Sequence, residues 1–183
     1  FYAAVLEDLM AQGENYGRSD YGKGKRVLVE FVSANPTGPM HIGNARGGAI
    51  GDCLAAVLDW AGYDVQREFY VNDAGNQIEK FGCSLEARYL QIFKGDEIEF
   101  PEDGYQGEDI KDLAKEYADL NGDSLVNVSA EERKKALVDY ALPKNIKKMQ
   151  ADMEKYKIFY DKWFFESELH KSGCLLYTSP SPR

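Results

Sequence analysis

The chain has 183 residues, of which 44% are hydrophobic and 13% aromatic, and its formal net charge is −9. This composition is typical of a folded domain and excludes a wholly disordered chain. No apolar run reaches the roughly 18 to 20 residues of a membrane span, and no basic-then-apolar leader opens the sequence. We therefore expect a cytoplasmic protein that does not bind membranes.

The charge is unevenly distributed along the chain. The net charge argues against a generic nucleic-acid coat. Residues 94–123 carry three basic and eleven acidic side chains, whereas residues 131–162 carry nine basic and six acidic ones. A polyanionic partner could therefore still bind the later segment.

The cysteines indicate a reducing compartment. Cys53, Cys83 and Cys174 are odd in number and widely spaced, which favours neither a disulfide framework nor a zinc site. We expect no protein-bound metal. Cys53 lies among apolar residues and is interpreted as a small residue of the core.

The first 25 residues are expected to be a helix end followed by a linker. Residues 1–12 place apolar side chains on one helical face, and the Gly-, Ser- and Asn-rich stretch 13–25 is typical of a surface loop. Phe1 is not a start residue, which suggests that the N-terminus is missing. We place a domain boundary near Gly24.

A strand, a turn and a helix follow, and they are the centre of the sequence. Residues 25–33 are rich in β-branched and apolar side chains, and residues 34–44 contain a Pro/Gly turn. A helix is predicted over 45–61, because Ile50, Leu54, Val57 and Leu58 recur at helical spacing, and Gly62 follows at the position that a helix C-cap prefers.

Residues 64–71 have the length and composition of a second strand. A strand, a crossover helix and a strand form a βαβ unit, so we predict a parallel sheet. Ligands of such sheets bind beyond the carboxyl ends of the strands. The turn 34–44 and the segment 72–77 both lie at that end.

The rest of the chain is predicted to be mainly helical before it returns to the sheet. Helices are expected over 76–93 and 108–120, separated by an acidic, turn-rich stretch. Ser129 is predicted to cap a further helix that ends before Pro143, where another helix can begin. The aromatic segment 158–165 is expected to rejoin the sheet. Residues 174–183 resemble a translated sequencing adapter and are excluded as a non-native tail.

The turn has the chemistry of a nucleotide site. A helix N-terminus offers unpaired N–H groups that favour anions, phosphate above all. His41 and Asn44 are three residues apart on the first helical turn, Pro39 restricts the backbone before them, and Gly43 leaves room for a flat base. An imidazole and an amide at this place suit the charge that develops during phosphate attack.

The whole block from Glu30 to Gly47, EFVSANPTGPMHIGNARG, resembles the HIGH signature of class I aminoacyl-tRNA synthetases and, more narrowly, that of bacterial arginyl-tRNA synthetases. Further matches are the segments FYVNDAGNQ (69–77), FPEDGY with GE (100–108), and WF through ES (163–167). The resemblance extends over nearly all of residues 1–173. Asn44 replaces the second His of the general signature; its amide can donate a hydrogen bond but cannot carry a proton.

The resemblance implies an α/β fold, namely a Rossmann-like parallel sheet with a HIGH-type nucleotide-binding turn and a mainly helical insertion. It divides the chain into the end of an N-terminal domain and its linker (1–24), the first half of the catalytic domain (25–93), an acidic helical insertion (94–157) and a return to the catalytic domain (158–173).

The resemblance also implies a function, the ATP-dependent activation of L-arginine and its transfer to tRNA(Arg), by a monomer that uses ATP with Mg²⁺. His41 and Asn44 are the implied catalytic residues. The implied ATP-binding residues are Pro39, His41, Gly43 and Asn44, and the implied arginine-binding residues are Glu30, Ser33 and Asn35.

Two interpretations apply to several residues. Asp73, Asn76 and Gln77 either line the pocket or cap a helix, for which Asp73 is suited. Tyr105 and the acidic stretch around it are more simply a solvated face of the insertion.

The family's second signature, a Lys-rich loop of the KMSKS type, does not occur in the sequence. We therefore expect the chain alone to be inactive. Two alternative functions are another HIGH-type nucleotidyltransferase and a non-catalytic nucleotide- or RNA-binding module. Protection of the protein by arginine, and by no other amino acid, would distinguish an arginyl-tRNA synthetase from the first alternative.

Overall fold

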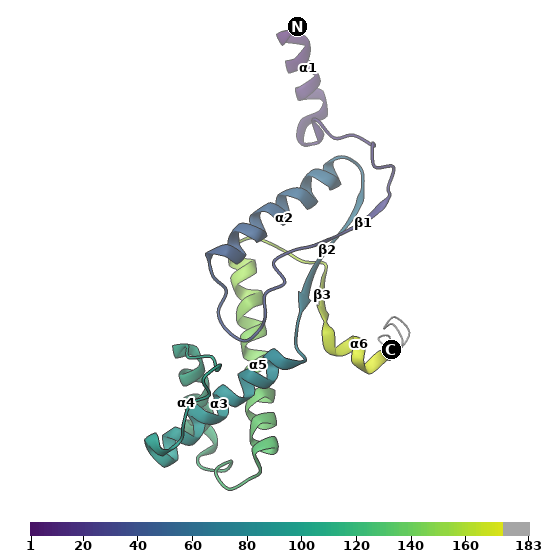
Figure 1. Cartoon of the computed structure of the whole chain (residues 1–183). Coiled ribbons are helices and arrows are strands. Elements are labelled where there is room, and N and C mark those ends of the chain that lie inside the picture. The colour runs from purple at the N-terminus through teal and green to yellow at the C-terminus, as the bar shows by residue number, and fades with distance from the viewer. Residues whose placement is uncertain (174–183) are drawn as a thin grey trace.

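In the computed structural model, residues 1–173 are described and contain a three-stranded parallel sheet (Figure 1). The non-native tail proposed for 174–183 lies outside the described residues. The elements in chain order are α1 (Tyr2–Gln12), the short 3₁₀ turn η1 (Gly13–Asn15), β1 (Arg26–Glu30), α2 (Ile42–Trp60), β2 (Asp64–Val71), α3 (Asn76–Lys94), the 3₁₀ turn η2 (Gly95–Glu97), α4 (Glu108–Asn121), α5 (Ala130–Lys155), β3 (Lys162–Phe165) and α6 (Glu166–Ser172). Helix α2 packs on the sheet, α3 and α4 pack with α5, and α1 projects away from the rest (Figure 1).

The sheet has the order β1-β2-β3, and both pairs are parallel, with Glu30 opposite Glu68 and Glu68 opposite Lys162. This confirms the predicted βαβ unit and the return of segment 158–165 to the sheet. The first strand is shorter than predicted. After Glu30 the backbone leaves the ladder, and Val32 and Ser33 adopt positive φ angles of 68° and 43°, which are rare for residues with a Cβ.

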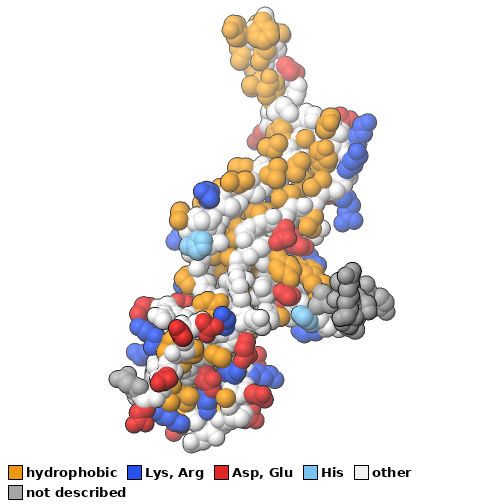
Figure 2. Space-filling model, in the orientation of Figure 1, with side chains coloured by type: hydrophobic (Ala, Val, Ile, Leu, Met, Phe, Trp, Pro, Cys, Tyr) orange, Lys and Arg blue, Asp and Glu red, His pale blue; other side chains and the backbone are white. Residues whose placement is uncertain are grey.

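Helix α2 packs on the sheet through small residues. A Cβ added to Gly51 would lie 2.2 Å from Cγ of Phe31, and Ala55 is fully buried. The helix predicted from the spacing of apolar residues does form, but three of those residues do not face the core, because Ile50, Leu54 and Val57 are 64%, 51% and 65% exposed. Apolar side chains accordingly cover much of the visible surface over α2 (Figure 2). Cys53 is also exposed, contrary to its prediction as a core residue.

The end of α2 follows the prediction. The helix finishes at Trp60 with Ala61 as its C-cap, and Gly62 follows with φ of 85°. Glycine is the residue that adopts this left-handed conformation without steric cost.

Helix α5 continues through Pro143, so the predicted break there was wrong. Its N-terminus does follow the prediction. Ser129 accepts a hydrogen bond from the backbone N–H of Glu132, whose side chain bonds back to complete a capping box. The helix continues because it is buried at both ends: Leu137 and Ala141 pack with α3 and α4, whereas Met149 and Met153 pack under the sheet. This burial outweighs the cost of about 3 kcal/mol that proline imposes inside a helix.

Two cores result. Helices α3, α4 and α5 enclose one around Phe81, Leu85, Tyr89 and Ile110. The other lies under the sheet, around Phe69 and Phe31. Within residues 1–173, no helix is long and apolar enough to cross a membrane.

Candidate functional site

The turn after β1 is held in place by buried backbone. Pro36 is buried, Thr37 is 7% exposed, and the carbonyl of Pro36 accepts a hydrogen bond from Nδ2 of Asn145 on α5 at 2.9 Å. A helix that is remote in sequence thus fixes the turn from below. The turn therefore presents His41 and Asn44 from a rigid base.

His41 is the N-cap of α2. Its Nδ1 accepts a hydrogen bond from the backbone N–H of Gly43 at 3.1 Å, and the backbone N–H of His41 donates to Oδ1 of Asn44 at 2.9 Å. A Cβ on Gly43 would lie 2.9 Å from Cε1 of His41. A side chain at position 43 would therefore displace the His41 ring from its capping position.

This cap determines which atoms face outward. In a neutral imidazole whose Nδ1 accepts, Nε2 carries the proton and donates. The Asn44 carboxamide uses its oxygen on the backbone, which leaves its NH₂ group free to donate. Both exposed polar ends are therefore donors at a helix N-terminus, an arrangement that suits an anion.

Glu30 and Ser33 lie together at the end of β1. The Ser33 hydroxyl donates to Oε1 of Glu30 at 2.8 Å and accepts from the backbone N–H of Tyr70 on β2 at 3.1 Å. The positive φ angle of Ser33 turns the chain back toward its own strand so that both bonds form. Strained backbone of this kind is frequent at functional sites.

Acidic side chains meet at the same end of β2 and β3. Asp73 accepts a hydrogen bond from the backbone N–H of Ser167 at 2.8 Å, and the amide nitrogen of Asn72 faces Oε2 of Glu166 at 2.8 Å. Burial raises the pKa of Tyr70, and the carboxylates of Glu166, Glu30 and Asp73 raise it further. The surroundings of Tyr70 are therefore negative, which favours a cationic ligand.

Asp73 does not cap α3, whose N-cap is Gly75. Instead it bonds the first turn of α6, the helix that begins at Glu166. The alternative prediction that Asp73 caps the helix after it was wrong. Its carboxylate ties the end of β2 to the end of β3.

A hollow of about 560 Å³ lies in front of the turn. Of the predicted site residues, those lining it are Ser33, Asn35, Pro39, His41, Asn44 and Gln77. Its wall does not include Glu30, Gly43, Asp73 or Asn76. Glu30 accepts a hydrogen bond from Ser33, which does line the hollow.

Tyr105 also lines the hollow and packs against the helical core, so its prediction as part of a solvated face was wrong. Tyr70 and Glu166 were missed as well. All three lie inside sequence blocks that carried the family resemblance, and that membership was the one available signal for them. Tyr70 and Glu166 come to one edge of the sheet through contacts between segments distant in sequence, such as that of Asp73 with Ser167, which are 94 residues apart.

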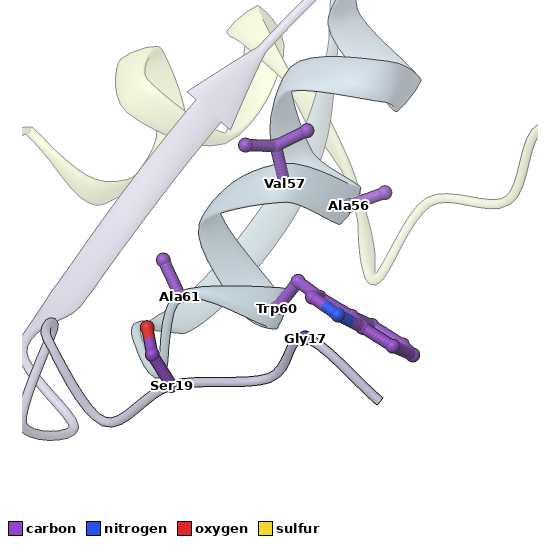
Figure 3. A pocket seen from close by; sticks show the side chains of 6 residues that line it. All are labelled: Gly17, Ser19, Ala56, Val57, Trp60 and Ala61. Carbon is purple, nitrogen blue, oxygen red and sulfur yellow. The ribbon is translucent and has the colours of Figure 1, made fainter. Parts of the chain in front are cut away.

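A second hollow, of about 400 Å³, lies where the loop before β1 passes the C-terminal end of α2 (Figure 3). Its lining is mostly apolar and includes Val57 and Trp60. The 19 residues of α2 separate it from His41, a helix length of about 28 Å. It belongs to a different region from the polar site.

Metal binding finds no support in the side-chain geometry of the described part of the chain, residues 1–173. No group of three or more His, Cys, Asp and Glu side chains there is placed to hold a metal ion.

Comparison with known proteins agrees with this geometry. The family model for the class I tRNA synthetase (R) catalytic domain matches residues 5–123. The arginine–tRNA ligase of Acetivibrio thermocellus is 62% identical over 170 residues, covering 92% of this chain and 30% of the relative. That of Ruminiclostridium cellulolyticum is 63% identical over 166 residues, covering 90% and 29%. The chain therefore spans about 30% of the length of these relatives.

Solved structures show the same fold. A Campylobacter jejuni structure assigned as an arginyl-tRNA synthetase superposes with a TM-score of 0.79 at 33% identity, covering 95% of this chain and 38% of that one. The Thermus thermophilus arginyl-tRNA synthetase superposes with a TM-score of 0.60 at 23% identity, covering 97% and 29%, and supports the fold alone. From its parallel sheet, its signature turn and these matches, the chain belongs to the catalytic-domain family of the class I arginyl-tRNA synthetases.

Proposed function

We propose that this chain is part of the catalytic domain of an arginine–tRNA ligase, which condenses L-arginine with ATP to arginyl-adenylate and then transfers the arginyl group to tRNA(Arg). One observation carries the proposal: donors for an anion and carboxylates for a cation occur at the same edge of the sheet. His41 and Asn44 supply the donors. Glu30, Asp73 and Glu166 supply the negative charge around Tyr70.

This arrangement matches the charges of the two small substrates. Arginine has a guanidinium at the far end of its side chain and an ammonium group on the carbon next to the carboxylate, and that carboxylate must reach the α-phosphate of ATP. In the proposed site, Glu30 faces the guanidinium, while Ser33 and Asn35 hold the α-amino group. Carboxylates bind a guanidinium through charge-assisted hydrogen bonds.

The proposed chemistry needs no covalent enzyme intermediate. The arginine carboxylate attacks the α-phosphate, pyrophosphate leaves, and the tRNA ribose hydroxyl then displaces AMP from the adenylate. His41 and Asn44 donate to phosphate oxygens on which charge builds up during the first step, with Pro39 and Gly43 shaping the turn beneath them. Positioning and charge stabilisation supply the rate.

Other properties are proposed because of the family resemblance. ATP would arrive with Mg²⁺ on its phosphates, and no residue of this chain is assigned to hold the ion. We propose a cytoplasmic monomer that is inactive as the 183-residue chain alone, because no Lys-rich loop of the KMSKS type occurs in the sequence.

The test uses a chimaera in which residues 1–173 replace the matching segment of the Acetivibrio thermocellus enzyme. We expect ATP–pyrophosphate exchange that requires arginine and tRNA(Arg), with no exchange when citrulline, which lacks the charge, replaces arginine. Glu30→Gln should raise the KM for arginine about tenfold or more, because it removes the charged partner of the guanidinium.

Asp64→Asn is the matched control. Asp64 lies on β2 at the opposite end of the sheet, next to Arg26. The Asp64→Asn variant should therefore keep the KM for arginine of the unsubstituted chimaera. An inactive chimaera beside an active parent enzyme would overturn the proposal. Exchange that proceeds equally well with other amino acids would overturn it too.

A further inference from the structure

One face of α3 is devoted to holding the loop that precedes α4. Lys80 pairs with Asp103 at 2.7 Å, and Oγ of Ser84 accepts the backbone N–H of Tyr105 at 2.8 Å. These two α3 residues are four apart, so they lie on one face of the helix. These two contacts hold the loop against α3.

The same face continues along α3. The guanidinium of Arg88 lies over the ring of Phe100 at 4.1 Å from its centroid, and Nε2 of Gln91 donates to the carbonyl of Ile98 at 2.8 Å. From Ser84 to Gln91, the α3 contacts meet the loop in reverse order, at Tyr105, Phe100 and Ile98. This part of the loop therefore runs antiparallel to α3 and is held at several points.

The tightest point lies directly before Tyr105. A Cβ on Gly104 would lie 2.8 Å from the Phe100 ring and 3.0 Å from Oγ of Ser84. Ser84 is itself fully buried. Tyr105 is thus delivered from a loop that has little freedom to move.

Tyr105 lines the polar hollow together with Gln77 of α3 and with residues of the segment from Val32 to Asn44. His41 and Tyr105 supply the aromatic rings of this lining. Among the described residues that line the hollow, none carries a carboxylate, so an uncharged part of a ligand can lie against the Tyr105 ring.

We propose that Tyr105 contacts substrate directly and that its ring stacks on an adenine base; this rests on the proposed function. Aromatic side chains bind nucleobases by stacking, because every base has a π-face that an aromatic ring can cover. Because Ser84 holds the backbone of Tyr105 and its side chain packs against the helical core, little conformational freedom is lost when the base arrives. The base belongs either to ATP or to the 3′-terminal adenosine of the tRNA.

The experiment measures three KM values in the chimaera, for ATP, tRNA(Arg) and arginine. Tyr105→Leu should raise the KM for ATP or for tRNA about tenfold, the magnitude expected for one lost stacking contact. Tyr105→Phe and Tyr105→Trp keep the ring and should stay within about twofold of the unsubstituted chimaera. The KM for arginine should not change in any of them.

The outcomes separate the two sources of adenine. A raised KM for ATP assigns the base to ATP, and a raised KM for tRNA assigns it to the terminal nucleoside. If Tyr105→Leu leaves both values unchanged, or if Tyr105→Phe loses as much as Tyr105→Leu, stacking is refuted. If the leucine variant does not fold, the phenylalanine and tryptophan variants decide: a tenfold rise in either refutes stacking, and near-unchanged values in both support it.

A different measurement tests the proposed function. It depends on the arginine requirement of the unsubstituted chimaera, whereas the role of Tyr105 depends on the ratio of KM values between its variants. A chimaera that requires arginine but is indifferent to Tyr105→Leu would overturn the inference alone.

Discussion

At the residue scale, His41 combines two tasks that are usually separate. Its Nδ1 accepts the N–H of Gly43 and closes the first turn of α2, and this leaves Nε2 as a donor. An N-cap residue is worth about 1 kcal/mol of stability, whereas a donor to a transition-state charge is worth a factor of about 10² to 10³ in rate. The two tasks can therefore be separated by substitution.

His41→Ala should remove both tasks, while His41→Ser should restore the cap, because serine is a good N-cap residue. In the chimaera, we expect both variants to lower the rate of exchange about 10²-fold or more, with little change in the KM for arginine. Thermal unfolding should show lower stability in the alanine variant alone. A serine variant that regains the rate would show that His41 acts only as a cap.

At the element scale, α2 approaches the sheet so closely that only small residues fit at the contact. Gly51 lies against Phe31, whereas a Cβ on Gly47, one helical turn earlier, would meet no atom within 4 Å. Both glycines lie within α2. They form a matched pair that distinguishes packing from helix propensity.

Gly51→Ala should destabilise the chain by about 1 to 3 kcal/mol, because the new methyl group overpacks the contact with Phe31. Gly47→Ala should instead stabilise it by about 0.5 to 1 kcal/mol, the ordinary gain of alanine over glycine inside a helix. Urea unfolding followed by circular dichroism measures both. Equal effects from the two variants would contradict the proposed close contact.

At the scale of the whole molecule, Tyr160 joins the parts of the core under the sheet. Its ring packs on Phe31, Phe69 and Trp163 at centroid distances of 4.7, 5.3 and 5.4 Å, and its hydroxyl donates to the carbonyl of Phe31 at 3.2 Å. Burial raises the pKa of Tyr160 strongly, and the charge of Asp52 raises it further. The folded chain therefore favours the neutral phenol.

This shift predicts a loss of stability in alkali. Below pH 10, the usual pKa of tyrosine, both states are protonated and the phenol contributes fully. Above it, the unfolded state loses the proton first, so the free energy of unfolding falls as the pH rises. Tyr160→Phe should show a shallower fall between pH 10 and 11.5, measured by urea unfolding. Parallel curves for both proteins would contradict this.

Much of the sheet region was predictable because local patterns and global fold agree there. The strand 64–71, the βαβ crossover and the cap at Ser129 each depend on short-range chemistry, namely side-chain type, turn residues and capping. The turn that carries His41 and Asn44 was predictable for the same reason, since its spacing places both residues on one turn of helix. The roles of the site residues stay proposals.

What the sequence by itself determined is therefore the order of elements, the parallel sheet and the family to which the chain belongs. Only the tertiary structure decided which face of α2 is buried, because close approach to Phe31 selects glycine and alanine over Ile50 and Leu54. It also decided that α5 runs through Pro143, since burial in two cores outweighs one lost backbone bond. Finally, it brought Tyr105 to the signature turn, by way of a loop that α3 holds in place.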